Sequence, residues 1–381
     1  MTIRLAGPND FEAAITEIGD ADRVAVDTEF HAEGRFLPEL FLLQVRVPSG
    51  NTWMFDAKGD GGIRRLGPVL CGRPWVLHAG QQDLRILQAW FGALPDVVYD
   101  TQIAAGLLCE RYPEGYASLV HRYLGSTIEK VERLSDWSAR PLRPEQLAYA
   151  AADVQLLFAL WDRLVEDLTA LDRLSVVQAA CADRLPPASP KTAAPSWRNL
   201  MAVPALDDPS VKALEALAAW RRTQAVDNNM PERSVLGDGL MIQLSRARPD
   251  SIRALRANRR MPKSVVRRHG EAIVGVMRAV AADPAPAPLV ARFRTPEWRR
   301  LDWLDCFAQC LARDESWSAN LVLPRPLLAE LACATPLDRE SLDARLGWRS
   351  ALAGAQLWEA MAGQVTLSFG ADVARGPAVR E

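Results

Sequence analysis

Short apolar runs and helical patterns alternate along the first 185 residues of the chain. The apolar runs have the lengths of strands, and we expect strands at 23–30, 41–47, 52–55, 75–78 and 97–99. Apolar positions at helical spacing predict helices at 81–90, at 101–108, and from residue 144 past residue 161. Consecutive strands followed by strand–helix units indicate an α/β domain with a mixed sheet flanked by helices.

The rest of the chain shows helical patterns only. Apolar residues recur at helical spacing at 211–224, 239–247, 250–257, 262–280 and 298–311. Two stretches rich in proline and alanine, at 185–195 and 281–288, are typical of stiff linkers. We therefore predict three domains: an α/β domain at 1–185 and two all-α domains at 205–282 and 291–381.

Composition narrows the class of protein. With 381 residues, of which 49% are hydrophobic and 24% charged, the chain is typical of a globular protein with several domains. No apolar run reaches the roughly 20 residues of a membrane span, and the N-terminal segment shows no secretion signal. The six cysteines form no CxxC pair and the four histidines lie far apart, which argues against a zinc site. We expect a reduced, cytoplasmic protein that has no membrane partner.

Charge is distributed unevenly along the chain, although the net charge is only −2. Residues 1–170 hold 16 Lys and Arg against 24 Asp and Glu, whereas residues 210–280 hold 14 against 6. An acidic first part and a basic middle part suit a catalytic body joined to an anion-binding module. Chance variation in surface charge is the alternative.

Asp27 and Glu29 lie two residues apart in the first predicted strand. Side chains alternate between the two faces of a strand, so both carboxylates emerge on one face and could bind a hard cation. The alternative is an edge strand with solvated carboxylates, but the neighbouring Val24, Val26 and Phe30 indicate a core strand.

Three further polar residues occur in otherwise apolar or small-residue segments. Asp83 lies at the start of a helix just after a strand, where it could also be a partner of the helix dipole. Tyr149 and Asp153 are four residues apart and share one face of a helix, with three alanines between them. Either feature alone is a weak signal. Carboxylates gathered in one pocket repel each other unless cations separate them, so the whole set indicates a two-metal site for phosphodiester cleavage.

The order of these residues resembles the DEDD exonuclease superfamily in its tyrosine-bearing branch, and within it the ribonuclease D family. The similar stretches are Val-Asp-Thr-Glu-Phe at 26–30, Tyr-Asp-Thr-Gln at 99–102, and the segment 135–154, which ends in Tyr-Ala-Ala-Ala-Asp-Val. The last of these is highly specific. The resemblance covers residues 1–185.

A second resemblance covers the helical region. Residues 217–222, 229–231 and 265–272 are similar to the helicase-and-RNase-D C-terminal module, abbreviated HRDC. Residues 291–381 resemble a degenerate second copy of that module, by position and helical pattern rather than by motif. The expected architecture is an RNase H-like exonuclease domain followed by two all-α domains of the HRDC type.

The resemblance implies a 3′→5′ exoribonuclease that trims RNA 3′ ends, as in tRNA maturation, and releases nucleoside 5′-monophosphates. It assigns the orientation of the attacking water to Tyr149 and metal binding to four carboxylates. These four are Asp27, Glu29, Asp83 and Asp153. Two divalent cations, Mg²⁺ or Mn²⁺, would activate the water and stabilise the leaving 3′ oxygen, since all four ligands offer oxygen.

The expected partner is RNA with a free 3′ end, such as a tRNA precursor, and we expect the chain to act as a monomer. Glu29 would accept a hydrogen bond from the terminal 3′-OH, which would restrict cleavage to that end. Two other interpretations stay open. One is a DNA exonuclease of the same superfamily, because a contact to the 2′-OH cannot be read from sequence. The other is a nucleic-acid-binding protein with an inactive nuclease fold, against which the intact acidic set argues.

The basic segment of the second predicted domain is the candidate RNA-binding surface. Cations there would contact phosphates and give affinity without sequence recognition, and a merely solvated face is the alternative. The candidates are Arg246, Arg248, Arg259, Arg260, Lys263, Arg267 and Arg268. Asp100, in the Tyr-Asp-Thr-Gln stretch, is expected to serve structure rather than metal binding.

Overall fold

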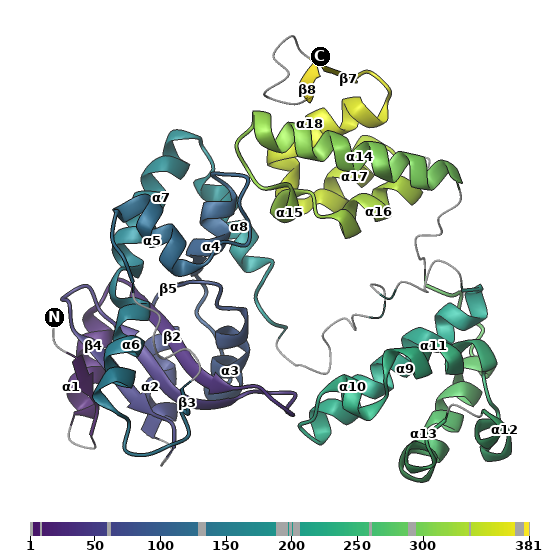
Figure 1. Cartoon of the computed structure of the whole chain (residues 1–381), viewed down its shortest axis with the longest axis horizontal. Coiled ribbons are helices and arrows are strands. Elements are labelled where there is room, and N and C mark those ends of the chain that lie inside the picture. The colour runs from purple at the N-terminus through teal and green to yellow at the C-terminus, as the bar shows by residue number, and fades with distance from the viewer. Residues whose placement is uncertain are drawn as a thin grey trace.

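The computed structural model describes residues 3–7, 10–58, 62–128, 135–187, 197, 200, 206–258, 261–288, 295–334, 337–369 and 377–380. Three groups of elements follow one another along the chain: an α/β part, a first helical part, and a second helical part that ends in a strand pair (Figure 1). Figure 1 colours them from purple through green to yellow.

The α/β part is built on a mixed sheet of six strands. In chain order it contains β1 (Ile3–Leu5), α1 (Phe11–Asp20), β2 (Val24–His31), β3 (Glu39–Arg46), β4 (Thr52–Asp56), α2 (Gly62–Cys71), β5 (Trp75–Leu77), α3 (Gln81–Phe91), β6 (Val98–Asp100), α4 (Thr101–Gly106), α5 (Tyr116–Leu124), α6 (Pro144–Gln155), α7 (Leu157–Ala170) and α8 (Leu174–Ala182). The strand order is β1-β4-β3-β2-β5-β6. β3 is antiparallel to β2 and β4, whereas β1–β4, β2–β5 and β5–β6 are parallel pairs.

Helices cover both faces of this sheet. On one face, Val24 and Val26 of β2 share an apolar core with α1, α2 and α3. On the other face, Ala150 and Ala151 of α6 pack on Leu42 of β3. The helices α4, α5, α7 and α8 form a further core beside α6. The predicted mixed sheet flanked by helices is therefore confirmed.

Several elements differ from the sequence-based expectation. β1, α1, α2, α5 and α8 are not predicted. β1 is a short, exposed strand, and α2 contains a proline, a residue that normally disfavours a helix interior. The helix predicted from residue 144 past residue 161 is instead two helices, which meet at Leu156. The Leu156 N–H donates to the hydroxyl of Tyr116 at 3.1 Å, and this long-range bond coincides with the break between α6 and α7.

The first helical part comprises α9 (Asp208–Asp227), α10 (Glu232–Val235), α11 (Asp238–Ala247), α12 (Ile252–Ala257) and α13 (Lys263–Ala282). α9 begins after Asp207, whose carboxylate accepts a hydrogen bond from Ser210 N at 3.0 Å. Leu214 and Leu217 of α9 and Ile273 of α13 share one buried core. The helices predicted here correspond to α9, α11, α12 and α13.

The second helical part comprises α14 (Thr295–Asp314), α15 (Ala319–Val322), α16 (Arg325–Cys333), α17 (Arg339–Leu346), a 3-10 turn at Gly347–Arg349, and α18 (Ser350–Met361). An antiparallel strand pair, β7 (Thr366–Phe369) and β8 (Pro377–Arg380), follows the helices and is not predicted from the sequence. Among the described helices, none combines the length and the apolar character that a membrane span requires.

The second helical part packs against the α/β part through a common core. Phe307 and Leu321 belong to the same buried cluster as Ile103 of α4. A Cβ atom at Gly106 would lie 2.8 Å from Cδ2 of Leu321, so glycine permits this close approach. The guanidinium of Arg173, just before α8, also donates to backbone carbonyls on both sides of the contact.

The turn between β2 and β3 contacts the first helical part. The Leu37 N–H donates to Oδ1 of Asn229 at 2.8 Å. The guanidinium groups of Arg85 and Arg222 lie 5.3 and 5.9 Å from the ring centroid of Phe36. Since Arg85 belongs to α3 and Arg222 to α9, this turn touches both the α/β part and the first helical part.

Candidate active site

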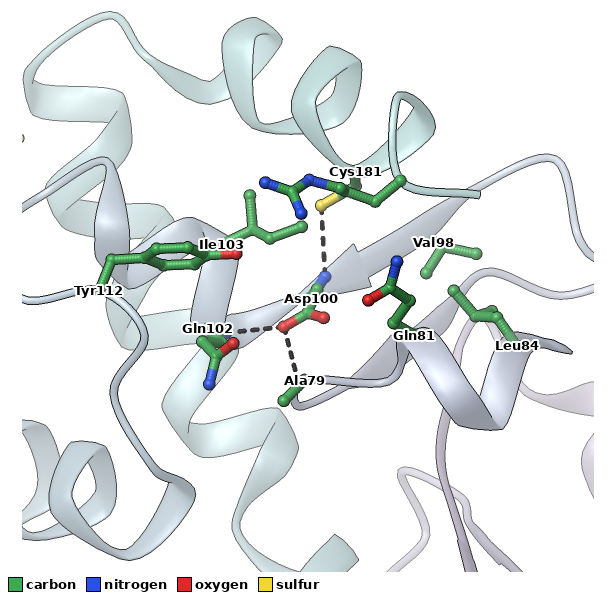
Figure 2. A pocket seen from close by; sticks show the side chains of 10 residues that line it. Ala79, Gln81, Leu84, Val98, Asp100, Gln102, Ile103, Tyr112 and Cys181 are labelled. Atoms are coloured by element: carbon green, nitrogen blue, oxygen red, sulfur yellow. Dashed lines mark hydrogen bonds between the residues drawn. The ribbon is translucent and has the colours of Figure 1, made fainter. Parts of the chain in front are cut away.

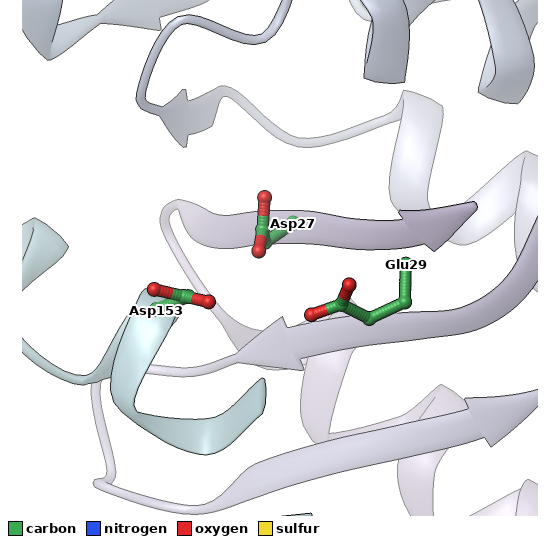
Figure 3. A group of neighbouring side chains, drawn as sticks. All are labelled: Asp27, Glu29 and Asp153. Atoms are coloured by element: carbon green, nitrogen blue, oxygen red, sulfur yellow. The ribbon is translucent and has the colours of Figure 1, made fainter. Parts of the chain in front are cut away.

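Three carboxylates meet over one face of the sheet. Asp27 and Glu29 project from β2, and Asp153 faces them from α6 (Figure 3). One carboxylate oxygen of each residue lies within 4.8 Å of the other two. All three side chains are half-buried. The strand alternation predicted for Asp27 and Glu29 thus places both beside the helical carboxylate.

Small side chains let α6 lie close to the sheet. Ala150 and Ala151 are fully buried and pack on Leu42 of β3 and Met54 of β4. A larger side chain at either alanine would lift the helix away from β2, and Asp153 would move with it.

Polar contacts fix the loop before α6 to the sheet. Both carboxylate oxygens of Asp56, at the end of β4, accept hydrogen bonds from the guanidinium of Arg140, at 2.5 and 2.6 Å. The side-chain amide of Gln146 donates to Oγ of Ser135 at 2.9 Å. Such a two-pronged arginine–carboxylate contact is geometrically specific, so it sets the position at which α6 begins.

Tyr149 lies one helical turn before Asp153, and its hydroxyl donates a hydrogen bond to that carboxylate. Its ring packs against Trp137, with the ring centroids 6.2 Å apart and the planes inclined at 44°. Burial, followed by the charges of the nearby carboxylates, raises the pKa of Tyr149 above its usual range. The hydroxyl therefore stays protonated at neutral pH and can serve as a hydrogen-bond donor.

Asp83 lies in the first turn of α3 and is buried. Its Oδ1 accepts a hydrogen bond from the hydroxyl of Thr28, the residue between Asp27 and Glu29. Asp83 is outside the group of three carboxylates whose oxygens lie within 4.8 Å of one another. After burial, however, its charge makes the largest contribution to raising the pKa of Asp27. The structure thus brings Asp83 to the edge of the cluster, where Thr28 holds it.

Asp100, at the end of β6, holds the turn that leads into α3. Its carboxylate accepts a hydrogen bond from the N–H of Ala79 at 2.9 Å (Figure 2). It also accepts one from the N–H of Gly80 at 3.1 Å. Gly80 lies close to Leu77, since a Cβ atom at position 80 would lie 2.5 Å from Cδ1 of that side chain. Asp100 therefore fixes the start of the helix that carries the fourth carboxylate, and its predicted structural role is confirmed.

Burial and mutual repulsion favour the protonated form of the carboxylates in the cluster. Burial, followed by the charge of Asp83, raises the pKa of Asp27 well above its usual value. Burial, followed by the charge of Asp153, raises the pKa of Glu29 to about 8. Burial also raises the pKa of Asp83 to about 6, although the hydrogen bond from Thr28 acts in the opposite direction. The cluster by itself therefore retains protons at neutral pH.

The donor set fits hard divalent cations. Carboxylate oxygens are the ligands that Mg²⁺ and Mn²⁺ prefer, and a cation would offset the repulsion that raises the pKa values. Asp27, Glu29 and Asp153 are the one group of His, Cys, Asp or Glu side chains at metal-binding spacing within the described ranges. They can hold a cation, and Asp83 stands beside them as a further carboxylate.

The candidate RNA-binding cations lie on the first helical part. The side chains of Arg246 on α11, and of Lys263, Arg267 and Arg268 on α13, are exposed. Across the part of the chain that the structure describes, none of these four forms an ion pair. They are therefore available to contact an anionic partner.

The other three candidate cations differ from these four. Arg248 ends α11 with a left-handed backbone, at φ 45°, and its guanidinium donates to Oγ of Ser210 at 2.7 Å. Arg248 thus already links α11 to α9. Arg259 and Arg260 lie outside the described residues.

Two residues near the cluster were not identified from the sequence. The hydroxyl of Tyr116, at the start of α5, is close enough to Asp153 and Asp27 for their charges to raise its pKa. Gln44 of β3 is paired in register with Asp27 of β2. The available signal for Gln44 was a single polar residue in the otherwise apolar run 40–45.

Comparisons with known proteins divide the chain into an exonuclease region and a helical region, as the structure does. The sequence model of a 3′-5′ exonuclease family matches residues 6–169, which hold all the candidate carboxylates and Tyr149. The model of the HRDC domain matches residues 210–277, from α9 into α13. The predicted boundaries at 1–185, 205–282 and 291–381 remain predictions.

Individual relatives match nearly the whole chain. Ribonuclease D of Acidiphilium cryptum is 31% identical over 357 residues, which cover 91% of this chain and 89% of that relative. Ribonuclease D of Xanthomonas oryzae pv. oryzae is 32% identical over 343 residues, which cover 88% of this chain and 92% of that relative.

A solved structure matches the fold over the same extent. The crystal structure of RNase D from Escherichia coli, described as an exoribonuclease involved in structured RNA processing, aligns with a TM-score of 0.76. The alignment covers 95% of this chain and 99% of that chain, at 24% sequence identity. The exonuclease domain followed by a helical HRDC region is therefore confirmed as the fold.

Proposed function

Since this chain belongs to the ribonuclease D family, we propose that it trims the 3′ ends of tRNA precursors at a two-cation site formed by its acidic cluster. It is a 3′-5′ exoribonuclease of the DEDD superfamily, and the α/β part is its exonuclease domain. The observation that carries the proposal is the approach of Asp27, Glu29 and Asp153 to within 4.8 Å of one another.

Four carboxylates would hold the cations. Asp27, Glu29 and Asp153 would form the centre of the site, and Asp83 would complete it from α3. Bound Mg²⁺ or Mn²⁺ would supply positive charge that lowers the pKa of a water and offsets the charge on the leaving 3′ oxygen. The raised pKa values of Asp27 and Glu29 support this assignment, because buried, mutually repelling carboxylates are stabilised by a cation between them.

Tyr149 would orient the attacking water by accepting a hydrogen bond from it, because the single O–H of the phenol is donated to Asp153. Its hydroxyl bonds to Asp153, so it already points toward the cluster. Its raised pKa keeps the proton on the phenol oxygen, which suits a group that positions a water rather than one that takes a proton from it. Packing against Trp137 limits the directions that the ring can take.

The substrate would be RNA with a free 3′ end. Glu29 would accept a hydrogen bond from the terminal 3′-OH, which would restrict hydrolysis to the last phosphodiester and release nucleoside 5′-monophosphates. The chain would act as a monomer in the cytoplasm, where tRNA precursors are processed.

The exposed cations of the first helical part would supply affinity for RNA. Four cations are exposed there and form no ion pair with any residue that the structure describes: Arg246, Lys263, Arg267 and Arg268. The exonuclease domain, in contrast, has an excess of acidic residues. Phosphate contacts give affinity that does not depend on sequence, which suits an enzyme that removes one nucleotide after another.

A panel of substrates tests this proposal. A tRNA precursor, a single-stranded RNA and a DNA of the same sequence, each 5′-labelled, would be incubated with Mg²⁺ or with EDTA. We expect stepwise shortening of both RNAs with Mg²⁺ only, faster than that of DNA, and no shortening by Asp153→Asn. DNA shortened as fast as RNA would favour the DNA exonuclease alternative. No shortening of any substrate would favour an inactive nucleic-acid-binding protein.

A further inference from the structure

Gln44 of β3 is a buried polar residue without a partner. Its exposed fraction is 0%, and neither its amide nitrogen nor its carbonyl oxygen has a hydrogen-bond partner among the described residues. Buried amides in proteins are nearly always paired, because an unpaired one has lost its hydrogen bonds to water without replacement. An unpaired amide in the middle of a sheet therefore requires an explanation.

The position of Gln44 suggests that explanation. The antiparallel register of β2 and β3 places Gln44 directly opposite Asp27. Residues that are directly opposite in such a pair project from the same face, with Cβ atoms about 4.5–5.5 Å apart. The amide of Gln44 therefore lies on the face of the sheet that carries Asp27 and Glu29.

The other side chains around this face leave few partners for an amide. Leu42, Met54 and Ala150 belong to the apolar cluster that joins α6 to this face of the sheet. The strand register brings the Asp27 carboxylate directly opposite Gln44, whereas Arg46, two residues further along β3, donates to Gly50 and Thr52. A primary amide offers two N–H donors, which match the acceptor oxygens of a carboxylate.

We propose that Gln44 is a positioning residue of the exonuclease site, whose amide donates a hydrogen bond to the Asp27 carboxylate, directly or through one water, when the cluster holds its cations. This inference rests on the proposed cation site. The bond would occupy one oxygen of Asp27 and direct the other toward the cation. Such outer-shell hydrogen bonds orient metal ligands, and their loss typically costs about 10–100-fold in metal affinity or activity.

The test is Gln44→Met, measured by binding of Mn²⁺ to the full-length protein without RNA. Methionine has a similar shape but no strong donor or acceptor. Titration of free Mn²⁺ by electron paramagnetic resonance should show affinity weakened by about 10–100-fold. The unfolding midpoint in EDTA should be unchanged or higher, because the amide has no partner to lose. With RNA present, kcat should fall while KM for RNA stays the same.

Leu43→Met is the matched control, since Leu43 is fully buried on the opposite face of the same strand. It should leave Mn²⁺ affinity unchanged. The inference is overturned if Gln44→Met binds Mn²⁺ as tightly as the wild-type protein. It is also overturned if Gln44→Met melts well below Leu43→Met in EDTA, because the amide then has a structural partner. If the wild-type protein itself binds no Mn²⁺, the proposed cation site fails first, so the two failures are distinguishable.

Discussion

The hydroxyl of Thr28 donates a hydrogen bond to the carboxylate of Asp83. Thr28 stands between Asp27 and Glu29 in β2, but its side chain projects from the opposite face of the strand, toward α3. One strand therefore presents two carboxylates on one face and orients a third from the other. The spacing of Asp27, Glu29 and Asp83 therefore depends on β2, a strand that lies inside the sheet.

Thr28→Val should distinguish the effect of the hydroxyl from that of the side-chain shape, because valine keeps the branched shape but has no hydrogen-bond donor. We expect the exonuclease rate at limiting Mg²⁺ to fall by about 10–100-fold and the Mg²⁺ requirement to rise. Thr28→Ser restores the hydroxyl and should recover most of the rate. Initial rates across a Mg²⁺ titration measure the rate at limiting Mg²⁺ and the Mg²⁺ concentration that each variant requires. Identical Mg²⁺ curves for the valine and serine variants would show that the hydroxyl does not position Asp83.

Asp27→Asn should abolish metal-dependent cleavage and yet stabilise the protein in EDTA near pH 8. In the folded protein the carboxyl of Asp27 must either hold a proton or carry a charge that Asp83 and Asp153 repel. Asparagine is neutral, so the substitution should stabilise the folded state relative to the unfolded state. Activity assays and thermal unfolding in EDTA measure the two effects. Turnover close to that of the wild-type protein would remove Asp27 from the site. A lower unfolding midpoint would show that the carboxyl of Asp27 does not destabilise the metal-free protein.

The stability of the protein in EDTA should fall as the pH rises. Glu29 has a pKa of about 8 in the folded protein against an ordinary value of 4.5, so the folded state binds more protons between these values. The free energy of unfolding must then decrease with increasing pH across that window. Thermal unfolding from pH 5 to pH 8 measures the slope. Glu29→Gln should flatten it, and an equal slope in that variant would assign the effect to other groups.

Tyr149→Phe should lower kcat while leaving RNA affinity nearly unchanged, because it removes the hydroxyl and keeps the ring against Trp137. Misplacement of a reacting group typically costs about 10²-fold in rate. Single-turnover rates and equilibrium binding to RNA with Ca²⁺ in place of Mg²⁺ separate the two quantities. Weaker RNA binding with an unchanged rate would make Tyr149 a substrate-binding residue instead.

Replacement of Lys263, Arg267 and Arg268 by alanine should weaken RNA binding and reduce its salt dependence. Each lost phosphate contact should lower the slope of log affinity against log salt by ~0.7–0.9. The rate at saturating RNA should persist, because these residues lie outside the exonuclease domain. Arg163→Ala is the control, since Arg163 is an exposed cation on α7 that pairs with Glu166. Equal slopes of log affinity against log salt in the triple variant and the control would show that RNA does not bind at these three residues.

The central part of the site could be predicted from the sequence because it depends on local geometry. The spacing of Asp27 and Glu29 places both on one face of any strand, and that of Tyr149 and Asp153 places both on one face of any helix. Gln44 could not be found in this way. Its relation to Asp27 depends on the register between two strands, which the pattern of either strand alone does not specify.

The fold shows the same division between local and long-range information. The central strands follow from their apolar runs, whereas the end of α6 at Leu156 coincides with a hydrogen bond that Leu156 donates to Tyr116, forty positions away. The packing of the second helical part on α4 likewise depends on the absence of a side chain at Gly106. Neither contact leaves a periodic signal in the sequence.

The central claim is that this acidic cluster hydrolyses RNA from a free 3′ end. The most direct measurement follows three forms of one RNA with Mg²⁺: with a 3′-OH, with a 3′-phosphate, and circular. Mass spectrometry would identify the products. The account predicts stepwise release of nucleoside 5′-monophosphates from the 3′-OH form, slow or no release from the 3′-phosphate form, and an intact circle. Internal fragments from the circular RNA, or equal release by Asp153→Asn, would contradict it.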